Sequence, residues 1–361
     1  MITYALIGCG RISPNHIQAA LQQKELQIVA LCDKNLEKAQ KLADTLPEEQ
    51  QKRIKIYTNY QEMLEKQRPE LCAIATESGE HAKIALDALD SGSNLIIEKP
   101  IALSLRDANT IIQRAEEKKL KVCACHQNRF NKSIQRVRKA LERGAFSKLL
   151  HGTAHVRWCR NEQYYTQAPW RGTWQQDGGA LMNQCIHNID LLRWMMGDEI
   201  QEVTAYISKL NHPYIQAEDL GLALIKFKNG SYGLIEGTTN VYPANLEETL
   251  YLFGEKGTVK VGGESVNIIE EWHFAEEDDA ETVKQEYSEQ PENVYGFGHK
   301  ALYQDMIEAI NNDRQPYVDA KAGMHALELV LAIYKSAKIG GPVSLPLNDF
   351  STLEMIDNFG D

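Results

Sequence analysis

The sequence predicts an α/β protein with two domains: a doubly wound parallel sheet, followed by an α+β domain with a large, mostly antiparallel open sheet. Up to about residue 125, apolar strand-like segments alternate with helical patterns, which is typical of a parallel sheet covered on both faces. From residue 149 to about residue 272, most apolar runs have strand character. We therefore expect domains at residues 1–126 and 127–361, with C-terminal helices that can pack back onto the first.

The composition is that of an ordinary globular protein, with 43% hydrophobic and 25% charged residues in 361. The net charge of -11 argues against binding to nucleic acid or an anionic membrane, because both require a basic surface. No segment approaches the roughly 20 apolar residues of a membrane helix, and no signal-peptide pattern begins the chain. The seven cysteines include no C-x-x-C pair, so we expect reduced thiols and a cytoplasmic protein.

Six strands and four intervening helices are expected in the first domain. The strand candidates are short, continuous apolar runs, which suits strands buried on both faces. The helix candidates between them have polar and apolar residues at helical spacing. The expected strands are 4–7, 28–32, 54–57, 72–75, 94–97 and 121–125, and the expected helices are 17–23, 36–45, 82–91 and 105–118.

A glycine-rich turn follows the first strand and has the form G-x-G-x-x-S, with Gly8 and Gly10 as its glycines. In the dinucleotide fingerprint of Rossmann domains, the first glycine permits a tight turn and the second lets the backbone approach the pyrophosphate. The third position needs a small residue, which Ser13 nearly supplies. The N-terminus of the next helix attracts phosphates. We expect Gly8, Gly10, Arg11 and Ile12 to bind a dinucleotide; a glycine-rich turn of another α/β fold is the alternative.

Asp33 supports the dinucleotide interpretation, because it ends the second strand 20 residues after Ser13. A carboxylate at this place accepts hydrogen bonds from the ribose hydroxyls of NAD and repels the 2′-phosphate of NADP. The alternative for Asp33 is that it caps the helix that begins near Leu36. Lys34 leaves some room for NADP, but the sequence favours NAD.

The ends of the fourth and fifth strands carry further candidates for the cofactor site. Ligands of open α/β sheets bind beyond the carboxyl ends of the strands, where Thr76 and His81 follow the fourth strand and Glu98 and Lys99 follow the fifth. His81 begins a helix, so a structural role is equally open. Pro100 stops the fifth strand and keeps Lys99 in extended geometry. Lys99 is therefore placed to meet both a nicotinamide ring and a substrate hydroxyl.

The second domain begins with a loop and a helix, residues 132–143, and continues mainly with strands. Asn229-Gly230 between two apolar runs predicts a hairpin. Residues 276–292 are rich in acids and are expected to form a solvated loop or edge segment. Helices are expected from about residue 299 to 311 and over 322–336. The expected strands are 150–158, 203–208, 221–228, 232–239, 249–254 and 258–261.

One helix, residues 180–196, is expected to interrupt these strands and carry polar chemistry. Asn183, His187, Asp190 and Trp194 follow one another at steps of four, three and four residues, so they share one face. A polar stripe on an apolar helix must face a partner, water or a ligand; a histidine satisfied by packing is the alternative. His187 with Asp190 lacks a second histidine or cysteine at ligand spacing, so no metal site is predicted.

The loop before that helix is aromatic and cationic. Between residues 157 and 171 there are three arginines and one acid, Glu162, so this stretch carries a net charge of +2 within an acidic chain. Sugar rings stack on aromatic faces, and arginine forks bind phosphates or carboxylates. We therefore expect Tyr165 and Arg171 to contact the substrate, together with His299, which precedes an amphipathic helix.

These motifs together resemble the Gfo/Idh/MocA oxidoreductases over nearly the whole chain. The resemblance rests on the glycine turn, on Glu98-Lys99-Pro100, and on the helix that carries Asn183, His187 and Asp190. It implies an NAD-binding Rossmann domain, a C-terminal α/β sheet and a catalytic pair formed by Lys99 and His187. Many members have aspartate where this chain has Asn183. Within the family, the loop and helix look most like UDP-N-acetylglucosaminuronate 3-dehydrogenases.

The implied activity is hydride transfer from a secondary alcohol of a sugar to NAD, at carbon 3 of a nucleotide sugar. His187 would accept the hydroxyl proton, Lys99 would hold the alcohol oxygen, Asn183 would position a neighbouring hydroxyl and Asp190 would orient His187. The alternatives are a simple sugar or myo-inositol dehydrogenase and a non-catalytic dinucleotide-binding sensor. An open sheet with exposed faces also leads us to expect a homodimer or homotetramer.

Overall fold

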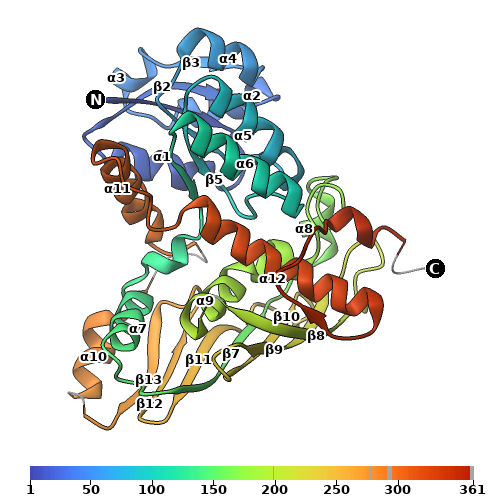
Figure 1. Cartoon of the computed structure of the whole chain (residues 1–361). Coiled ribbons are helices and arrows are strands. Elements are labelled where there is room, and N and C mark those ends of the chain that lie inside the picture. The colour runs from blue at the N-terminus through green and yellow to red at the C-terminus, as the bar shows by residue number, and fades with distance from the viewer. Residues whose placement is uncertain (198, 277–278, 291–294, 358–361) are drawn as a thin grey trace. The chain divides into compact units, whose positions relative to one another are not determined.

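A computed structural model describes residues 1–357 except 198, 277–278 and 291–294. The chain divides into two compact units (Figure 1). Unit 1 contains Met1–His126 and His299–Met324, and unit 2 contains Gln127–Gly298 and His325–Asp361. A segment near the C-terminus therefore belongs to the N-terminal unit. Among the described residues, no helix combines the length and the apolar character needed to cross a membrane.

Unit 1 is built on a six-stranded sheet whose strand pairs are all parallel. Its order, β3-β2-β1-β4-β5-β6, changes direction between β1 and β4, and ligands bind at such a switch point. All four residues of β4 are buried, so both faces of the sheet are covered. The predicted doubly wound sheet is confirmed. Its strands are β1 Ile2–Ile7, β2 Leu26–Cys32, β3 Lys55–Tyr57, β4 Leu71–Ile74, β5 Asn94–Ile97 and β6 Val122–Ala124.

The helices of unit 1 connect consecutive strands, and several begin at side-chain caps. The side chains of Asn35, Asn59 and Ser104 accept backbone N–H groups at the starts of α2, α4 and α6, which stabilises helix N-termini. The helices are α1 Ser13–Leu21, α2 Leu36–Ala43, α3 Glu48–Gln51, α4 Tyr60–Gln67, α5 His81–Asp90 and α6 Leu105–Lys118. Most of α11, Gly298–Asn311, also belongs to this unit.

Unit 2 contains an eight-stranded sheet, ordered β13-β12-β11-β7-β10-β9-β8-β14. Only the pair β7 and β10 is parallel in this sheet, so the predicted, mostly antiparallel sheet is confirmed. The Asn229-Gly230 turn joins β9 to β10 as an antiparallel hairpin, as predicted. The strands are β7 Leu149–Arg157, β8 Ile200–Ser208, β9 Leu220–Phe227, β10 Tyr232–Thr238, β11 Glu247–Gly254, β12 Gly257–Gly262, β13 Ile268–Phe274 and β14 Val343–Ser344.

One prediction for unit 2 was wrong, and another is confirmed with a local difference. The acidic segment 276–292 is not only a loop, because it contains helix α10, Ala280–Tyr287, which Asp279 caps and which buries Val283. The helix expected over 180–196 is not regular: it begins as a π-helix, Leu181–Cys185, and continues as α9, Ile186–Met196. The other helices described are α7 Lys132–Glu142, α8 Glu162–Thr166 and α12 Ala320–Ile339, with short 3₁₀ turns at Ser78–Glu80, Gln127–Phe130 and Thr352–Met355.

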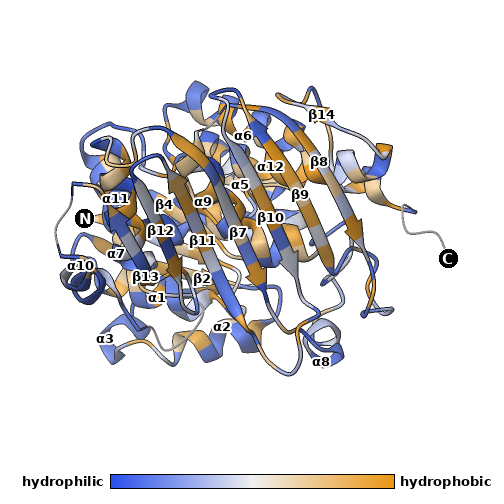
Figure 2. Cartoon of the chain, turned by 90° about the horizontal axis from the view of Figure 1, so that it is seen from below, coloured by the Kyte–Doolittle hydropathy of each residue, from blue (hydrophilic) through white to orange (hydrophobic). Residues whose placement is uncertain are grey.

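The two faces of the unit 2 sheet differ in how well they are covered. Helix α9 packs on β7, β10 and β11, and residues of the strands alternate between buried and exposed. The other face carries apolar side chains in solvent, and Figure 2 shows hydrophobic stretches along β8, β9 and β10. The exposed residues there include Tyr206, Leu222, Leu224, Tyr232 and Leu234.

Candidate active site

The glycine turn after β1 has the geometry that a dinucleotide phosphate requires. Gly8 has a φ of +97°, and a Cβ atom there would lie 2.4 Å from the backbone oxygen of Ala75. Only glycine fits such a position without strain. A Cβ at Gly10 would meet no atom within 4 Å, so its backbone is open to approach. Ser13 is buried, and its hydroxyl donates to the Gly10 carbonyl at 2.6 Å, as suits the small third residue of the fingerprint.

Asp33 is fixed beside this turn by two backbone groups. One carboxylate oxygen accepts from the Cys9 N–H and the other from the Asn35 N–H, each at 2.8 Å. Asn35, not Asp33, caps helix α2, so the alternative capping role for Asp33 is wrong. Arg11 is exposed and Ile12 is half-buried. Both lie between the glycine turn and the start of α1.

The contacts of His81 support the structural one of its two open alternatives. Its side chain is buried, and its ring nitrogens lie 2.7 Å from the Pro100 carbonyl oxygen and 3.1 Å from the Thr76 carbonyl oxygen. Burial lowers the pKa of this histidine. Since both ring nitrogens face backbone oxygens, His81 ties the loop after β4 to the segment after β5, and its cofactor contact stays a prediction. Thr76 itself is half-buried in that loop.

Lys99 follows β5 and is half-buried, with a cis peptide bond to Pro100. Glu98 is enclosed in unit 1, where only 7% of it is exposed, and its predicted cofactor contact stays a prediction. One of its oxygens lies 3.0 Å from His16 Nε2 and 3.8 Å from His299 Nε2. Burial alone would raise the pKa of Glu98, but the two histidines outweigh it and hold the pKa well below its usual range.

His299 is buried beside Glu98 in unit 1, and its substrate contact stays a prediction. His16, Glu98 and His299 form a cluster that no local sequence pattern could predict, because they come from α1, the end of β5 and α11. Tyr303 extends it: its hydroxyl lies 2.7 Å from His16 Nδ1 and 2.8 Å from the Tyr4 hydroxyl. Burial lowers the pKa of His299.

The same cluster offers a donor set that the sequence did not suggest. The ligand atoms of His16, Glu98, Cys125 and His299 all lie within 4.8 Å of one another. Imidazole, carboxylate and thiolate are zinc ligands, so these residues have the chemistry to hold a cation. The contacts of His16 with Glu98 and Tyr303 satisfy its ring without one, and we interpret the cluster as a hydrogen-bonded support beneath Lys99.

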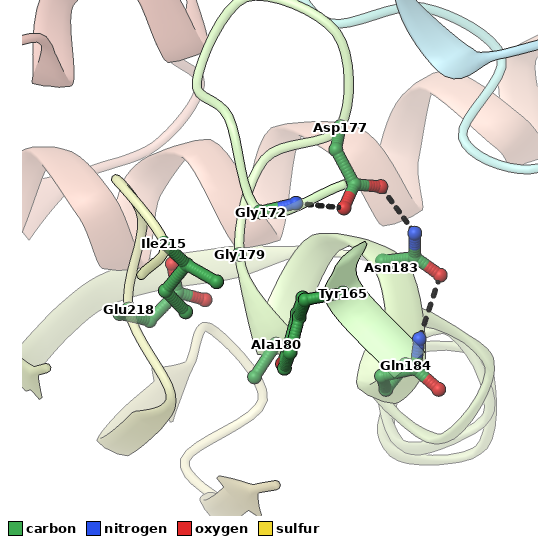
Figure 3. Close-up of a pocket in the computed structure, with 9 residues that line it drawn as sticks. All are labelled: Tyr165, Gly172, Asp177, Gly179, Ala180, Asn183, Gln184, Ile215 and Glu218. Carbon is green, nitrogen blue, oxygen red and sulfur yellow. Dashed lines mark hydrogen bonds between the residues drawn. The ribbon is translucent and has the colours of Figure 1, made fainter. Parts of the chain in front are cut away.

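A pocket in unit 2 brings together the aromatic loop and the predicted polar helix (Figure 3). Asn183 lies in it with its amide held at both ends: it donates to one oxygen of Asp177 and accepts from Gln184 Nε2 at 2.9 Å. The other oxygen of Asp177 accepts from the Gly172 N–H at 2.7 Å. The pocket is lined by Tyr165, Gly172, Asp177, Gly179, Ala180, Asn183, Gln184, Ile215 and Glu218.

Two glycines of the sheet set the position of Asn183. Gly221 of β9 and Gly237 of β10 are cross-strand partners, and a Cβ on either would lie within 2.6 Å of the Leu181 side chain. Because both lack a side chain, the π-helix packs directly on the strands. A π-turn changes the direction of the side chains that follow it, and such turns recur at functional sites.

His187 and Asp190 lie on α9, immediately after the π-turn. His187 is half-buried. Asp190 is 2% exposed and accepts from Arg129 Nε and Nη2 at 2.7 and 2.6 Å, one bond to each carboxylate oxygen. This bidentate pair engages Asp190 with Arg129, so the predicted orienting of His187 by Asp190 stays a prediction. Trp194, further along the same helix, has Arg129 and Arg138 over its ring, each at 4.7 Å.

Glu218 is an unusual acid at the base of this pocket. It is fully buried, and one oxygen accepts from the Leu181 N–H at 2.8 Å and from the Tyr334 hydroxyl at 2.9 Å. The other oxygen has no hydrogen-bond partner among the described residues. Burial raises the pKa of Glu218 to about 8, so the side chain is mainly protonated at neutral pH. No sequence pattern singled out this acid.

The predicted substrate residues Tyr165 and Arg171 come from the loop around α8. Tyr165 is buried in the pocket wall, and its hydroxyl lies 3.2 Å from Thr239 Oγ1. Arg171 stacks on the Tyr164 ring at 4.1 Å and donates to the Tyr164 carbonyl at 2.6 Å. Sequence analysis missed Asp177 and Gln184, although both adjoin motifs that it singled out.

Comparison with known proteins identifies both parts of the chain. Residues 2–126 match the family described as "Oxidoreductase family, NAD-binding Rossmann fold", and residues 138–345 match its "C-terminal alpha/beta domain". Among curated relatives, the chain is 24% identical to myo-inositol 2-dehydrogenase of Thermotoga maritima, over 70% of this chain and 73% of that protein. These matches confirm the predicted family and its NAD-binding domain. The dehydrogenase among the relatives agrees with the predicted class of enzyme.

Two solved structures resemble the chain over almost its whole length. The WlbA dehydrogenase from Bordetella pertussis, in complex with NADH and UDP-GlcNAcA, is 37% identical with a TM-score of 0.90, and the match covers 96% of this chain and 98% of that one. The enzyme of the same name from Chromobacterium violaceum, with the same two ligands, is 32% identical with a TM-score of 0.87, covering 96% of each chain.

Proposed function

Because the chain belongs to the Gfo/Idh/MocA family of NAD-binding oxidoreductases, we propose that it oxidises carbon 3 of a UDP-linked sugar acid such as UDP-N-acetylglucosaminuronate. The observation that carries this proposal is the pocket around Asn183, which places amide, carboxyl and phenol groups beside a cationic loop. Such a lining offers hydrogen bonds to sugar hydroxyls and an arginine to an acidic substrate. The likeness to two WlbA enzymes holding NADH and UDP-GlcNAcA supports the same substrate.

The protein's own residues divide the work of alcohol oxidation in this proposal. When bound at the glycine turn, NAD supplies the hydride acceptor. His187 takes the proton from the reacting hydroxyl, as a general base near neutral pH. Lys99 donates to the alcohol oxygen and stabilises negative charge as the proton leaves. Asn183, which Asp177 and Gln184 hold in one orientation, positions a neighbouring hydroxyl but cannot act as a base.

The experiment is a turnover assay that follows NADH absorbance with UDP-GlcNAcA and NAD. Lys99→Ala should lower kcat by about a hundredfold or more, since it removes one oxyanion donor. His187→Gln should lower it by a similar factor through loss of the base. Lys83→Ala and His273→Gln are the matched controls, because both residues are exposed and should leave turnover unchanged. Retention of most turnover in Lys99→Ala would contradict the assignment.

A simple sugar or myo-inositol dehydrogenase is the second candidate, because a curated relative at 24% identity has the latter activity. A substrate panel separates the two candidates: UDP alone should inhibit only an enzyme that binds the nucleotide. NAD binding without reduction across the panel would point instead to a sensor that keeps the fold without turnover.

We also propose that the chain is a cytoplasmic homodimer or homotetramer that assembles through the open face of the unit 2 sheet. Tyr206, Leu222, Leu224, Tyr232 and Leu234 are exposed on β8, β9 and β10, and apolar patches of this kind mark association surfaces. None of the seven cysteines is assigned to a disulfide, which suits a reducing compartment. Leu224→Glu should reduce the mass measured by light scattering after gel filtration, whereas Leu353→Glu, at another exposed leucine, should not.

A further inference from the structure

Two arginines of unit 2 carry charges that the protein does not neutralise. No carboxylate oxygen of the described residues lies within 4.0 Å of the guanidinium nitrogens of Arg160 or Arg171. This is unusual in a chain with a net charge of -11. Other arginines of the unit have acid partners: Arg129 with Asp190, Arg138 with Glu142, Arg157 with Glu236 and Arg193 with Glu328.

The two unpaired guanidinium groups share one aromatic ring. The Cζ atom of Arg171 lies 4.1 Å from the centroid of the Tyr164 ring, and that of Arg160 lies 5.0 Å from it. The two Cζ atoms are therefore at most 9.1 Å apart, the sum of these distances. Like charges so close repel each other unless an anion joins them. Stacking on the ring holds each guanidinium in place without neutralising it.

Neutral acceptors fix the orientation of both arginines, and some of the guanidinium N–H groups keep no acceptor. Arg160 donates to the Cys159 carbonyl at 2.7 Å, to Asn245 Oδ1 at 3.0 Å and to Gln184 Oε1 at 2.8 Å. Arg171 donates from Nη1 to the Tyr164 carbonyl. The Nε atom of each arginine is buried and has no hydrogen-bond partner among the described residues. Buried donors of this kind normally find a partner.

A hydrogen-bond chain links this pair to the pocket. Gln184 accepts from Arg160 and donates through Nε2 to the Tyr164 hydroxyl at 2.8 Å and to Asn183 Oδ1 at 2.9 Å. The cationic pair and the amide proposed to position a sugar hydroxyl therefore belong to one connected network. An anionic group that reaches the arginines is coupled through Gln184 to the orientation of Asn183.

We propose that Arg160 and Arg171 form an oxyanion subsite that binds an acidic group of the substrate. The inference rests on the proposed function for the identity of that substrate. Two groups of a UDP-linked uronate have this chemistry, the carboxylate of the sugar and the diphosphate, and arginine forks recognise both. Of the two arginines, only Arg171 stood out in the sequence, so Arg160 is a newly assigned specificity residue.

Calorimetric titration with NADH present tests the subsite, using UDP-GlcNAcA, UDP-GlcNAc and UDP as ligands. Arg160→Met and Arg171→Met should each weaken binding of UDP-GlcNAcA by about tenfold or more, as loss of a charge-assisted bond does. Arg160→Lys and Arg171→Lys keep the charge and should recover part of the affinity. Arg114→Met, at a half-buried arginine of unit 1 paired with Asp90, is the charge-matched control and should bind as the wild type does.

The ligand series identifies which group is bound. If only UDP-GlcNAcA loses affinity, the subsite holds the carboxylate; if all three ligands lose it equally, the subsite holds the diphosphate. Unchanged affinity for every ligand in both methionine variants, with melting temperatures near that of the wild type, would overturn the proposal. Should the wild type bind no UDP ligand, the proposed substrate is wrong, and D-glucuronate and pyrophosphate become the probes. Binding of either that the variants lose would still support the subsite, and no binding would reject it.

Discussion

Glu218→Gln should remove a pH-dependent penalty from the stability of unit 2. Burial raises the pKa of this carboxyl from 4.5 to about 8, so between those values the folded protein keeps a proton that the unfolded chain has lost. Stability falls with rising pH wherever the folded state binds more protons. The wild type should therefore lose stability from about pH 5 to pH 8, whereas a neutral glutamine has no proton to hold.

The magnitude follows from the size of the shift. Each pKa unit corresponds to about 1.4 kcal/mol, so a shift from 4.5 to about 8 gives a total penalty on the order of 5 kcal/mol. The difference in unfolding free energy between Glu218→Gln and the wild type should grow by about 1.4 kcal/mol per pH unit near pH 6 to 7. The part of this free-energy difference that does not change with pH depends on how well the glutamine N–H₂ group fits where the unpartnered carboxyl oxygen lies.

Urea unfolding followed by tryptophan fluorescence measures this difference in the right part of the chain. All five tryptophans, at positions 158, 170, 174, 194 and 272, belong to unit 2. Glu264→Gln, at an exposed position, is the matched control and should track the wild type at every pH. If the difference between Glu218→Gln and the wild type were the same at all pH values, Glu218 would ionise like an exposed acid and the reasoning would fail.

Three further predictions concern unit 1. Gly8→Ala should lower the free energy of unfolding by about 2 kcal/mol or more and weaken NADH binding in a fluorescence titration, because its Cβ would overlap Ala75. Gly92→Ala, also at positive φ but in open space, is the control and should destabilise the protein less. Tyr303→Phe should cost about 1–3 kcal/mol by circular dichroism melting, since it leaves buried groups unpaired; a loss well below that would show that water replaces the hydroxyl. Chelation with EDTA should leave turnover unchanged, because hydrogen bonds already satisfy His16; lost activity restored by zinc would make the buried cluster a metal site.

The sequence predicted the parallel sheet well because its strands are short apolar runs bounded by glycine, proline and polar residues. Strands buried on both faces are continuously apolar, so they do not need an alternating pattern to be found. The glycine turn marks the end of the first strand. The same patterns could not reveal the cluster around Glu98. His16, Glu98 and His299 meet only because α11 belongs to the unit formed by the first 126 residues, and no local pattern specifies such a return of the chain.

Unit 2 shows a different limit, at α10 and at two arginines. The acids of α10 suggested a solvated loop, but Asp279 caps the helix and Val283, its one buried residue, anchors it. Local composition gives little weight to one buried residue. In the same way, the charges of Arg160 and Arg171 were visible in the sequence, yet their lack of acid partners appears only when the surrounding side chains are in place.

The π-turn shows how a small backbone feature decides the chemistry of the site. Regular helical spacing put Asn183, His187 and Asp190 on one face, and from that spacing Asp190 was expected to support His187. The close approach of Leu181 to Gly221 and Gly237 fixes the π-helix on the sheet. Further along the helix, Asp190 accepts two hydrogen bonds from Arg129, and its support of His187 stays a prediction. Asn183 is instead oriented from outside its helix, by Asp177. Glycines that pair across two strands, invisible as a pair in the sequence, thus let the π-helix pack directly on the sheet beside the pocket.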